Sequence, residues 1–361
     1  MSATEVDFIV IGAGSAGCAV AARLSEKRDV DVVVFEAGAR NDSIFVRWPA
    51  GLVKLQNERN RWEWLTTEQP NCDDRRVPTP QGRLVGGGSA VNGMVYIRGN
   101  PKDYDAWAAV GNDQWSYSKV LPFFRLAEDN VRFSDEWHGT GGPLGVSDQL
   151  SPSNLTRLFV RAGQEAGHPY NADFNGARQS GVGLYQVTQR NGRRCSSAHA
   201  YLYPALRRSN LKLETRARIL RIIVEKNVAT GIEFVREGAN RIETLRARCE
   251  IIVSSGAINS PKLLMLSGIG PANEISAVGI KPIHDVPGVG QNLHDHVDAY
   301  LHVTLKKPVS YTGQDRGIAA LRHGAEYLLF GTGAVTSNIC EGGLFASSDN
   351  DPSWPDLQLH F

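Results

Sequence analysis

Glycines and one acidic residue near the start of the chain have the spacing of a nucleotide-binding site. Gly12, Gly14 and Gly17 form the pattern G-x-G-x-x-G, and Glu36 follows nineteen residues after the third glycine. The first glycine permits a tight turn, the second lets main chain approach a pyrophosphate, and the third lets a helix lie close to a strand. A carboxylate at Glu36 can accept hydrogen bonds from ribose hydroxyls and disfavours a 2′-phosphate. The pattern predicts a dinucleotide site, either for FAD or for NAD.

A second glycine-rich segment separates these two dinucleotides. Residues 81–95 contain three consecutive glycines, Gly86–Gly88. A tight turn does not need three glycines, whereas main chain lying against a flat ring system or a diphosphate does. Since an NAD-binding domain has no use for such a segment here, the sequence favours FAD.

Three other patterns allow more than one interpretation. Residues 292–296 place two histidines around an aspartate, a pattern compatible with a metal site or with a structural loop, and no metal ion is predicted. Arg193 and Arg194 favour a solvated turn or a structural ion pair over contact with an anion. A helix expected over 317–330 has one apolar face, which favours core packing over a lid or a membrane-contacting surface. The members of that face are Ile318, Leu321, Ala325, Leu328 and Leu329.

The elements expected around the first glycine motif form a βαβ unit. Phe8–Ile11 and Asp31–Phe35 are short, apolar and rich in β-branched residues, as buried parallel strands are. Between them, Cys18–Leu24 has small and apolar residues suited to a helix packed on a sheet. Cys249–Val253 is a later buried strand. This order of elements predicts an α/β fold.

Composition excludes several classes of protein. The formal net charge is +1 over 361 residues, so neither nucleic acid nor an anionic membrane is an expected electrostatic partner. No apolar run reaches the length of a membrane helix, and no signal peptide is recognisable. The five cysteines form no C-x-x-C pair, which favours reduced thiols and a cytoplasmic location. Neither a G-x-S-x-G elbow nor a second dinucleotide motif occurs, which disfavours serine hydrolases and disulfide reductases.

Two long segments carry a family resemblance. Gly82–Asp105 and Gly256–Gly270 are similar to the two signatures of the glucose–methanol–choline (GMC) oxidoreductase family, in the same order and spacing. The resemblance covers the whole chain. It implies a Rossmann-type FAD-binding domain with an interleaved α+β substrate domain. The expected division is 1–150 and 191–300 for the FAD-binding domain, and 151–190 and 301–361 for the substrate domain.

The resemblance also implies which residues contact FAD. A core tryptophan is the alternative for Trp62, and a plain core strand residue is the alternative for Ile219. Some family members attach FAD covalently through a histidine at the position of Asn92, so this asparagine implies non-covalent FAD. The implied contacts are Gly12, Gly14, Ser15 and Ala16 to the pyrophosphate, Glu36, Ala37 and the main chain of Ile219 to the adenosine, and Trp62, Val85, Asn92, Gly93, Met94 and Val95 to the flavin ring.

The catalytic base of the family is a histidine far toward the C-terminus. None of the nine histidines here matches its pattern, and the residues up to Phe361 resemble the interior of a strand. The resemblance therefore implies that the catalytic histidine lies beyond Phe361. The chain is expected to be C-terminally incomplete and inactive by itself.

The implied reaction is oxidation of a primary alcohol or sugar alcohol, by hydride transfer to flavin N5. Residues 138–144, 173–176 and 336–343 look most like bacterial members that act on sorbose, polyethylene glycol or aliphatic alcohols. Electrons are expected to pass to a quinone or an artificial acceptor, with peripheral contact to the inner membrane. The alternatives are an oxidase that uses oxygen, a choline dehydrogenase, and a family lyase or photodecarboxylase.

Overall fold

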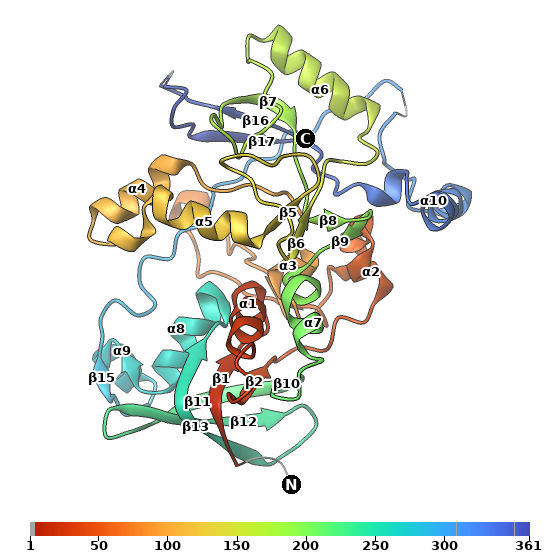
Figure 1. Cartoon of the computed structure of the whole chain (residues 1–361). Coiled ribbons are helices and arrows are strands. Elements are labelled where there is room, and N and C mark those ends of the chain that lie inside the picture. The colour runs from red at the N-terminus through yellow and green to blue at the C-terminus, as the bar shows by residue number, and fades with distance from the viewer. Residues whose placement is uncertain (1–3, 308, 350) are drawn as a thin grey trace. The chain divides into compact units, whose positions relative to one another are not determined.

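The computed structural model describes residues 4–307, 309–349 and 351–361. The chain divides into two compact units, and Figure 1 shows their elements. Unit 1 contains the residues up to Asp42, together with Gln56–Val91 and Ser196–His302. Unit 2 contains Ser43–Leu55, Asn92–Cys195 and Val303–Phe361.

A six-stranded sheet organises unit 1. Its strands are β1 (Glu5–Ile11), β2 (Val32–Phe35), β10 (Leu211–Glu214), β11 (Ala217–Glu225), β12 (Val228–Arg236) and β13 (Ile242–Val253). The order is β10-β2-β1-β13-β12-β11, in which the first four strands are parallel and the last two form an antiparallel extension. The three predicted strands all lie in the parallel part, which confirms the α/β class.

Alternate side chains of β2 supply the cores on both faces of this sheet. Val32 and Val34 pack with the small residues of helix α1 (Ser15–Leu24), which confirms the predicted βαβ unit. Val33 and Phe35 face the antiparallel hairpin, where the ring centroids of Phe35 and Phe234 lie 4.8 Å apart. Because both faces are covered, β2 is apolar throughout and does not alternate with polar residues.

Shorter elements complete unit 1. The strand pairs are β3 (Arg61–Trp62) with β4 (Gln81–Gly82), and β14 (Ile269–Gly270) with β15 (His284–Asp285). The helices are α3 (Gly88–Val91), α7 (Tyr203–Ala205), α8 (Gly256–Leu266) and α9 (Ala272–Ala277), with a 3₁₀ turn at Pro70–Cys72 and a π turn, η4, at Ala198–Leu202.

Unit 2 is built on a three-stranded antiparallel sheet with the order β17-β16-β7. Val160 of helix α6 packs on one face, against Val182 and Leu344. The other face carries an aromatic cluster against which Val95 and Ile97 pack. The strands are β5 (Glu128–Asn130), β6 (Leu144–Val146), β7 (Gly181–Leu184), β8 (Gln189–Arg190), β9 (Arg193–Arg194), β16 (Gly342–Ala346) and β17 (Leu357–His360). The helices are α2 (Ile44–Arg47), α4 (Pro101–Ala109), α5 (Tyr117–Ala127), α6 (Asn154–Glu165) and α10 (Gly317–Phe330), with 3₁₀ turns at Pro49–Leu55, Asp113–Trp115 and Ala334–Thr336.

The compact units do not follow the predicted domain boundaries. Residues 43–55 and 92–150 belong to unit 2 by their contacts, because segments such as Val95–Ile97 pack on its sheet. The predicted domains were defined by the ligand that each binds, which these contacts do not test. That functional division stays a prediction.

Helix α10 is confirmed, but the expected core packing of its apolar face is wrong. Ile318 is 85 % exposed and Leu329 is 75 % exposed. Tyr327, on the opposite side of the helix, is buried and donates a hydrogen bond to the carbonyl oxygen of Gly192 at 3.0 Å. The helix is therefore anchored through a tyrosine, and its aliphatic face is left outside the core. Within the described part of the chain, no helix combines the length and apolar character needed to cross a bilayer.

Candidate cofactor site

The glycines at the carboxyl end of β1 have two different physical roles. A Cβ atom on Gly17 would lie 1.9 Å from the carbonyl oxygen of Gly12, and one on Gly12 would lie 2.5 Å from the carbonyl oxygen of Ser254. These two glycines are required by close packing within the protein. By contrast, a Cβ on Gly14 would meet nothing closer than 3.9 Å. The space beside Gly14 is thus open for a ligand, as the motif predicts.

The N-terminus of α1 offers unused hydrogen-bond donors beside this space. Gly14 is the N-cap and supplies no side-chain cap, and the first turn holds no acidic residue. Ser15 and Ala16 are exposed there, whereas Gly17 and Cys18 are buried. Free N–H groups and the positive end of the helix dipole together favour an anion such as a pyrophosphate. The helix therefore has the geometry that the sequence predicted.

Glu36 lies at the end of β2, beside the same turn. Its two carboxylate oxygens accept hydrogen bonds from the main-chain N–H groups of Ala13 at 3.1 Å and Gly38 at 2.8 Å. Burial raises the pKa of this carboxyl, while the two N–H groups and the positive charge of Arg83 act in the opposite direction. Each oxygen keeps acceptor capacity for a ribose hydroxyl. Ala37, the next residue, is partly exposed at this position.

The second glycine-rich segment lies along the first. Gly86 donates its N–H to the carbonyl oxygen of Ala13 at 2.7 Å, and a Cβ on Gly87 would lie 2.8 Å from the Cα of Gly14. Gly86 and Gly87 have φ angles of +98° and +52°, which favour glycine. A Cβ on Gly88 would meet nothing within 4 Å. The run of glycines therefore serves close packing at two positions and leaves open space at the third.

Three of the predicted contact residues of unit 1 make packing contacts within the protein, and their contact with FAD stays a prediction. The side chain of Val85 is fully buried in the core with α1, so its main chain alone remains for a ligand. The ring of Trp62 stacks on Trp64. Ile219 is paired with Phe234 inside the sheet. Ala217 of the same strand as Ile219 contacts Glu36 directly, because its N–H donates to the carbonyl oxygen of Glu36 at 3.0 Å. No sequence pattern indicated this contact.

The predicted flavin-facing segment, Asn92–Val95, lies in unit 2 and is held in an unusual conformation. Met94 is fully buried and has a φ angle of +58°, which is uncommon for a residue other than glycine. The side-chain oxygen of Asn92 accepts hydrogen bonds from the N–H of Met94 at 3.1 Å and from Nη1 of Arg194 at 2.8 Å. Nδ2 of Asn338 donates to the carbonyl oxygen of Gly93 at 2.7 Å. Backbone strain of this kind is typical of functional segments.

Arg194 and Asn338 therefore hold the segment that the sequence predicted to face the flavin. Arg194 is 1 % exposed, so the expected solvated turn is wrong at this position, and burial lowers the pKa of its guanidinium to about 10. Its Nε also donates to the carbonyl oxygen of Val46 at 3.1 Å. Both residues are distant in sequence from Asn92 and have no motif of their own.

A buried network of charges lies in unit 2 close to the same segment. His138 contacts Glu128 through Nδ1 at 2.9 Å and Asp173 through Nε2 at 3.0 Å. Arg98 pairs with the other oxygen of Glu128 at 2.7 Å, and its main-chain N–H donates to Asn175. Burial alone lowers the pKa of His138, but the hydrogen bonds to both carboxylates raise it to about 9. His138 is thus an imidazolium held between two carboxylates, one of which also pairs with Arg98.

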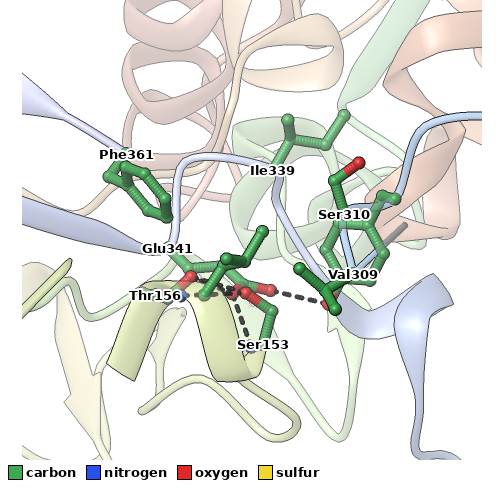
Figure 2. Close-up of a pocket in the computed structure, with 9 residues that line it drawn as sticks. Ser153, Thr156, Val309, Ser310, Ile339, Glu341 and Phe361 are labelled. Atoms are coloured by element: carbon green, nitrogen blue, oxygen red, sulfur yellow. Dashed lines mark hydrogen bonds between the residues drawn. The ribbon is translucent and has the colours of Figure 1, made fainter. Parts of the chain in front are cut away.

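A cavity of about 110 Å³ is present elsewhere in unit 2 (Figure 2). Buried Glu341 lines it and accepts hydrogen bonds from the N–H of Ser153 at 2.7 Å, Oγ1 of Thr156 at 2.7 Å and the hydroxyl of Tyr311 at 3.2 Å. The carboxylate therefore lies at the N-terminus of α6, where the helix dipole favours it. The remaining lining residues are Leu155, Val309, Ser310, Ile339 and Phe361.

The segment 292–296 is exposed along its whole length. Across the described ranges, no group of three or more His, Cys, Asp and Glu side chains is arranged to hold a metal ion. His296 makes a local contact, donating its main-chain N–H to the Asp295 carboxylate at 2.9 Å. The loop therefore supplies no argument for a metal site.

Comparison with known proteins identifies the family. The GMC oxidoreductase model matches residues 6–298. An oxygen-dependent choline dehydrogenase of Brucella anthropi is 41 % identical over 358 residues, which cover 99 % of this chain and 65 % of that protein. The chain thus spans about 65 % of the length of the curated relatives it matches.

Solved structures agree with this assignment. Pyridoxine 4-oxidase from Mesorbium loti has a TM-score of 0.74 at 35 % identity, and the match covers 78 % of this chain and 55 % of the other. An FAD-dependent oxidoreductase from Chaetomium thermophilum has a TM-score of 0.85 at 27 % identity, and that match covers 95 % and 62 %. The open space beside Gly14, the free N–H groups of α1 and the buried Glu36 fit the same cofactor. The chain belongs to the GMC oxidoreductase family, and its cofactor is FAD.

Proposed function

We propose that this chain is the FAD-binding portion of an enzyme that oxidises an alcohol group. The observation that carries the proposal is the cradle of unit 1, where Gly14 faces open space beside the free donors of α1 and the carboxylate of Glu36. When bound, FAD supplies the acceptor for the hydride that leaves the alcohol carbon. Membership of the GMC family supports this reaction class.

The residues of the chain have positioning roles in this proposal. The N–H groups at Ser15 and Ala16 hold the pyrophosphate, and the oxygens of Glu36 accept from the ribose hydroxyls. Asn92–Val95 is the segment proposed to face the flavin ring, held by Arg194 and Asn338. None of the histidines is assigned as the base. The inactivity expected of the chain by itself stays a prediction, as does non-covalent attachment of FAD.

We propose oxygen as the electron acceptor in place of the quinone that the sequence favoured. The names of similar proteins support this proposal. Two curated relatives, at 41 and 42 % identity, are oxygen-dependent choline dehydrogenases, and a solved structure at 35 % identity is pyridoxine 4-oxidase. The quinone acceptor and peripheral membrane contact have no comparable support and stay predictions, as does the cytoplasmic location.

A choline-like alcohol is the substrate that we propose. Besides the names of the relatives, the cavity of unit 2 supports it. Glu341 is 1 % exposed, and the donors Ser153, Thr156 and Tyr311 that hydrogen-bond its carboxylate are uncharged. The aromatic rings of Tyr311 and Phe361 line the same cavity. A carboxylate beside aromatic rings suits a quaternary ammonium group.

The test uses the protein in its longest natural form, reconstituted with FAD. Loss of the visible absorption of flavin is followed anaerobically with choline, sorbose and aliphatic alcohols, and peroxide is measured after air is admitted. Choline-dependent bleaching followed by peroxide is expected. Protein that binds no FAD refutes the proposal, and bleaching without peroxide refutes oxygen as the acceptor.

Glu341→Gln tests the substrate class separately. The variant keeps an oxygen for Ser153 and Thr156 but removes the charge. The KM for choline is expected to rise about tenfold, the value of one charge interaction at a partly desolvated site. The matched control substrate is 3,3-dimethyl-1-butanol, which has the shape of choline without its charge, and its KM should not change. Equal effects on both substrates would show that Glu341 acts only as a cap of α6.

A further inference from the structure

Four side chains of unit 1 form a stack in which two aromatic rings lie between two cations. The guanidinium of Arg83 lies 4.8 Å from the ring centroid of Trp62. Trp62 stacks on Trp64, with centroids 5.6 Å apart and planes at 19°. Nζ of Lys262, from α8, lies 4.6 Å from the centroid of Trp64. Each contact is a favourable cation–π or stacking interaction, and together they restrict the position of the Arg83 guanidinium group. We call these four residues the ladder.

Two donors of the ladder lack acceptors. Nε of Arg83 and Nε1 of Trp64 are both buried, and neither has a hydrogen-bond partner among the described residues. No ion pair or hydrogen bond within the described chain involves the Arg83 side chain at all. Guanidinium is always charged and carries five N–H groups in its plane. The contact with the ring of Trp62 gives these N–H groups no oxygen acceptor, although buried donors are normally paired.

The main chain places Arg83 at the adenosine end of the cradle. A Cβ on Gly38 would lie 2.0 Å from the carbonyl oxygen of Arg83, so the main chain of Arg83 lies against Gly38. Gly38 follows Glu36 by two residues in the sequence. The same segment continues to Gly87, which lies against Gly14 at the pyrophosphate end. The charge of Arg83 also acts on the Glu36 carboxyl, in the direction that favours its ionised form.

We propose that Arg83 is a cofactor-binding residue that donates to an oxygen of the AMP half of FAD, and that Trp62, Trp64 and Lys262 position its guanidinium. The inference rests on the proposed binding of FAD in this cradle. A phosphate or ribose oxygen of FAD would be the acceptor that the unpartnered donors lack. The proposal also gives Trp62 a role at the AMP half of FAD, whereas the family resemblance implied a position near the flavin.

The test compares Arg83→Gln, Arg83→Lys and the matched control Arg28→Gln. Arg28 is an exposed arginine of the same unit. Affinity for FAD is measured by quenching of flavin fluorescence, and affinity for ADP by displacement of FAD. Arg83→Gln should weaken FAD and ADP by the same factor, about tenfold to a hundredfold, which is the value of one or two charge-assisted hydrogen bonds. Arg83→Lys keeps the charge but loses the planar fork, and should be intermediate.

Several outcomes overturn the inference. Affinities of Arg83→Gln within twofold of wild type would do so, and so would weaker FAD binding with unchanged ADP binding, which would place Arg83 at the flavin half. Urea unfolding of each variant shows whether it is folded. If Arg83→Gln does not fold, Arg83→Lys decides the question by the same comparison. A wild-type chain that binds ADP but not FAD would refute the proposed function, and the ADP affinities would still decide the role of Arg83.

Discussion

Gly14→Ala and Gly17→Ala form a matched pair of substitutions within one motif. Each substitution adds one methyl group, and the two positions are three residues apart in the sequence. At Gly14 the nearest protein atom to the new Cβ is the carbonyl oxygen of Ser254 at 3.9 Å, which is an ordinary contact. At Gly17 the new Cβ would lie 1.9 Å from the carbonyl oxygen of Gly12, which is main chain. The first change should therefore affect binding, and the second should affect folding.

The magnitudes follow from the local geometry. Gly14 has φ −78° and ψ −162°, which alanine adopts without strain. Losing glycine at an N-cap costs about 0.5–1 kcal/mol, and the less flexible unfolded chain returns about 0.4–1 kcal/mol. The free energy of unfolding of Gly14→Ala should thus stay within about 0.5 kcal/mol of wild type. Gly17→Ala cannot relieve its overlap by rotating a side chain, and should lose about 3 kcal/mol or more.

The loss of affinity for FAD should be the larger for Gly14→Ala, which is the variant with the smaller loss of stability. The methyl group of Gly14→Ala occupies the open space proposed for the pyrophosphate, so the dissociation constant for FAD should rise about tenfold to a hundredfold. Stability is measured by urea unfolding without FAD, and affinity by flavin fluorescence on folded protein. A Gly14→Ala variant that binds FAD as wild type does would refute the assignment of this space. A Gly17→Ala variant with wild-type stability would refute the packing argument.

Three further predictions concern the charge of His138, the reactivity of Cys18 and the attachment of FAD. The pKa of His138 is raised to about 9 from 6.5, so its contribution to stability is complete below pH 6.5 and is lost as the pH rises through about 9. The pKa values of Glu128 and Asp173 are lowered in spite of burial, so their contributions are lost only in acid. Urea unfolding of wild-type protein from pH 5 to 10 should show this loss of stability at alkaline pH. The His138→Gln variant should not show it, and its free energy of unfolding at pH 6 should be lower by about 3 kcal/mol. The same pH profile for the variant and for wild type would exclude a stabilising imidazolium. Burial raises the pKa of Cys18 to about 12, so iodoacetamide at pH 8 should label exposed Cys249 and spare Cys18 in native protein, as peptide mass spectrometry can check. Precipitation in acid should leave the polypeptide colourless and FAD in the supernatant; a yellow pellet would contradict non-covalent binding.

The sequence predicted the parts of the cofactor site that are contiguous in the chain. Gly12–Gly17 and Glu36 belong to one βαβ unit, so the turn, the helix N-terminus and the acid follow from local rules about glycine, strands and helix dipoles. The strand at Cys249–Val253 followed from an apolar run of the right length, whereas its parallel pairing with β1 is seen only in the structure. The predicted helix over 317–330 was also confirmed, because its periodicity is local.

Contacts between distant segments were not predictable in this way. The apolar face of α10 was expected in the core, but periodicity specifies a face without specifying what covers it. Arg194 looked like part of a solvated turn, and only the fold buries it against Asn92. His138 has no recognisable motif with Glu128 and Asp173, since the three residues come from different elements.

By itself, the sequence determined the class of fold, the cofactor and the family, because each depends on residues close together along the chain or on long signatures. The tertiary structure alone decided which glycines serve packing and which face open space, and it brought Arg83, Trp62, Trp64 and Lys262 together. The physical reason is that close approach and desolvation are properties of three-dimensional neighbours, which sequence spacing does not specify.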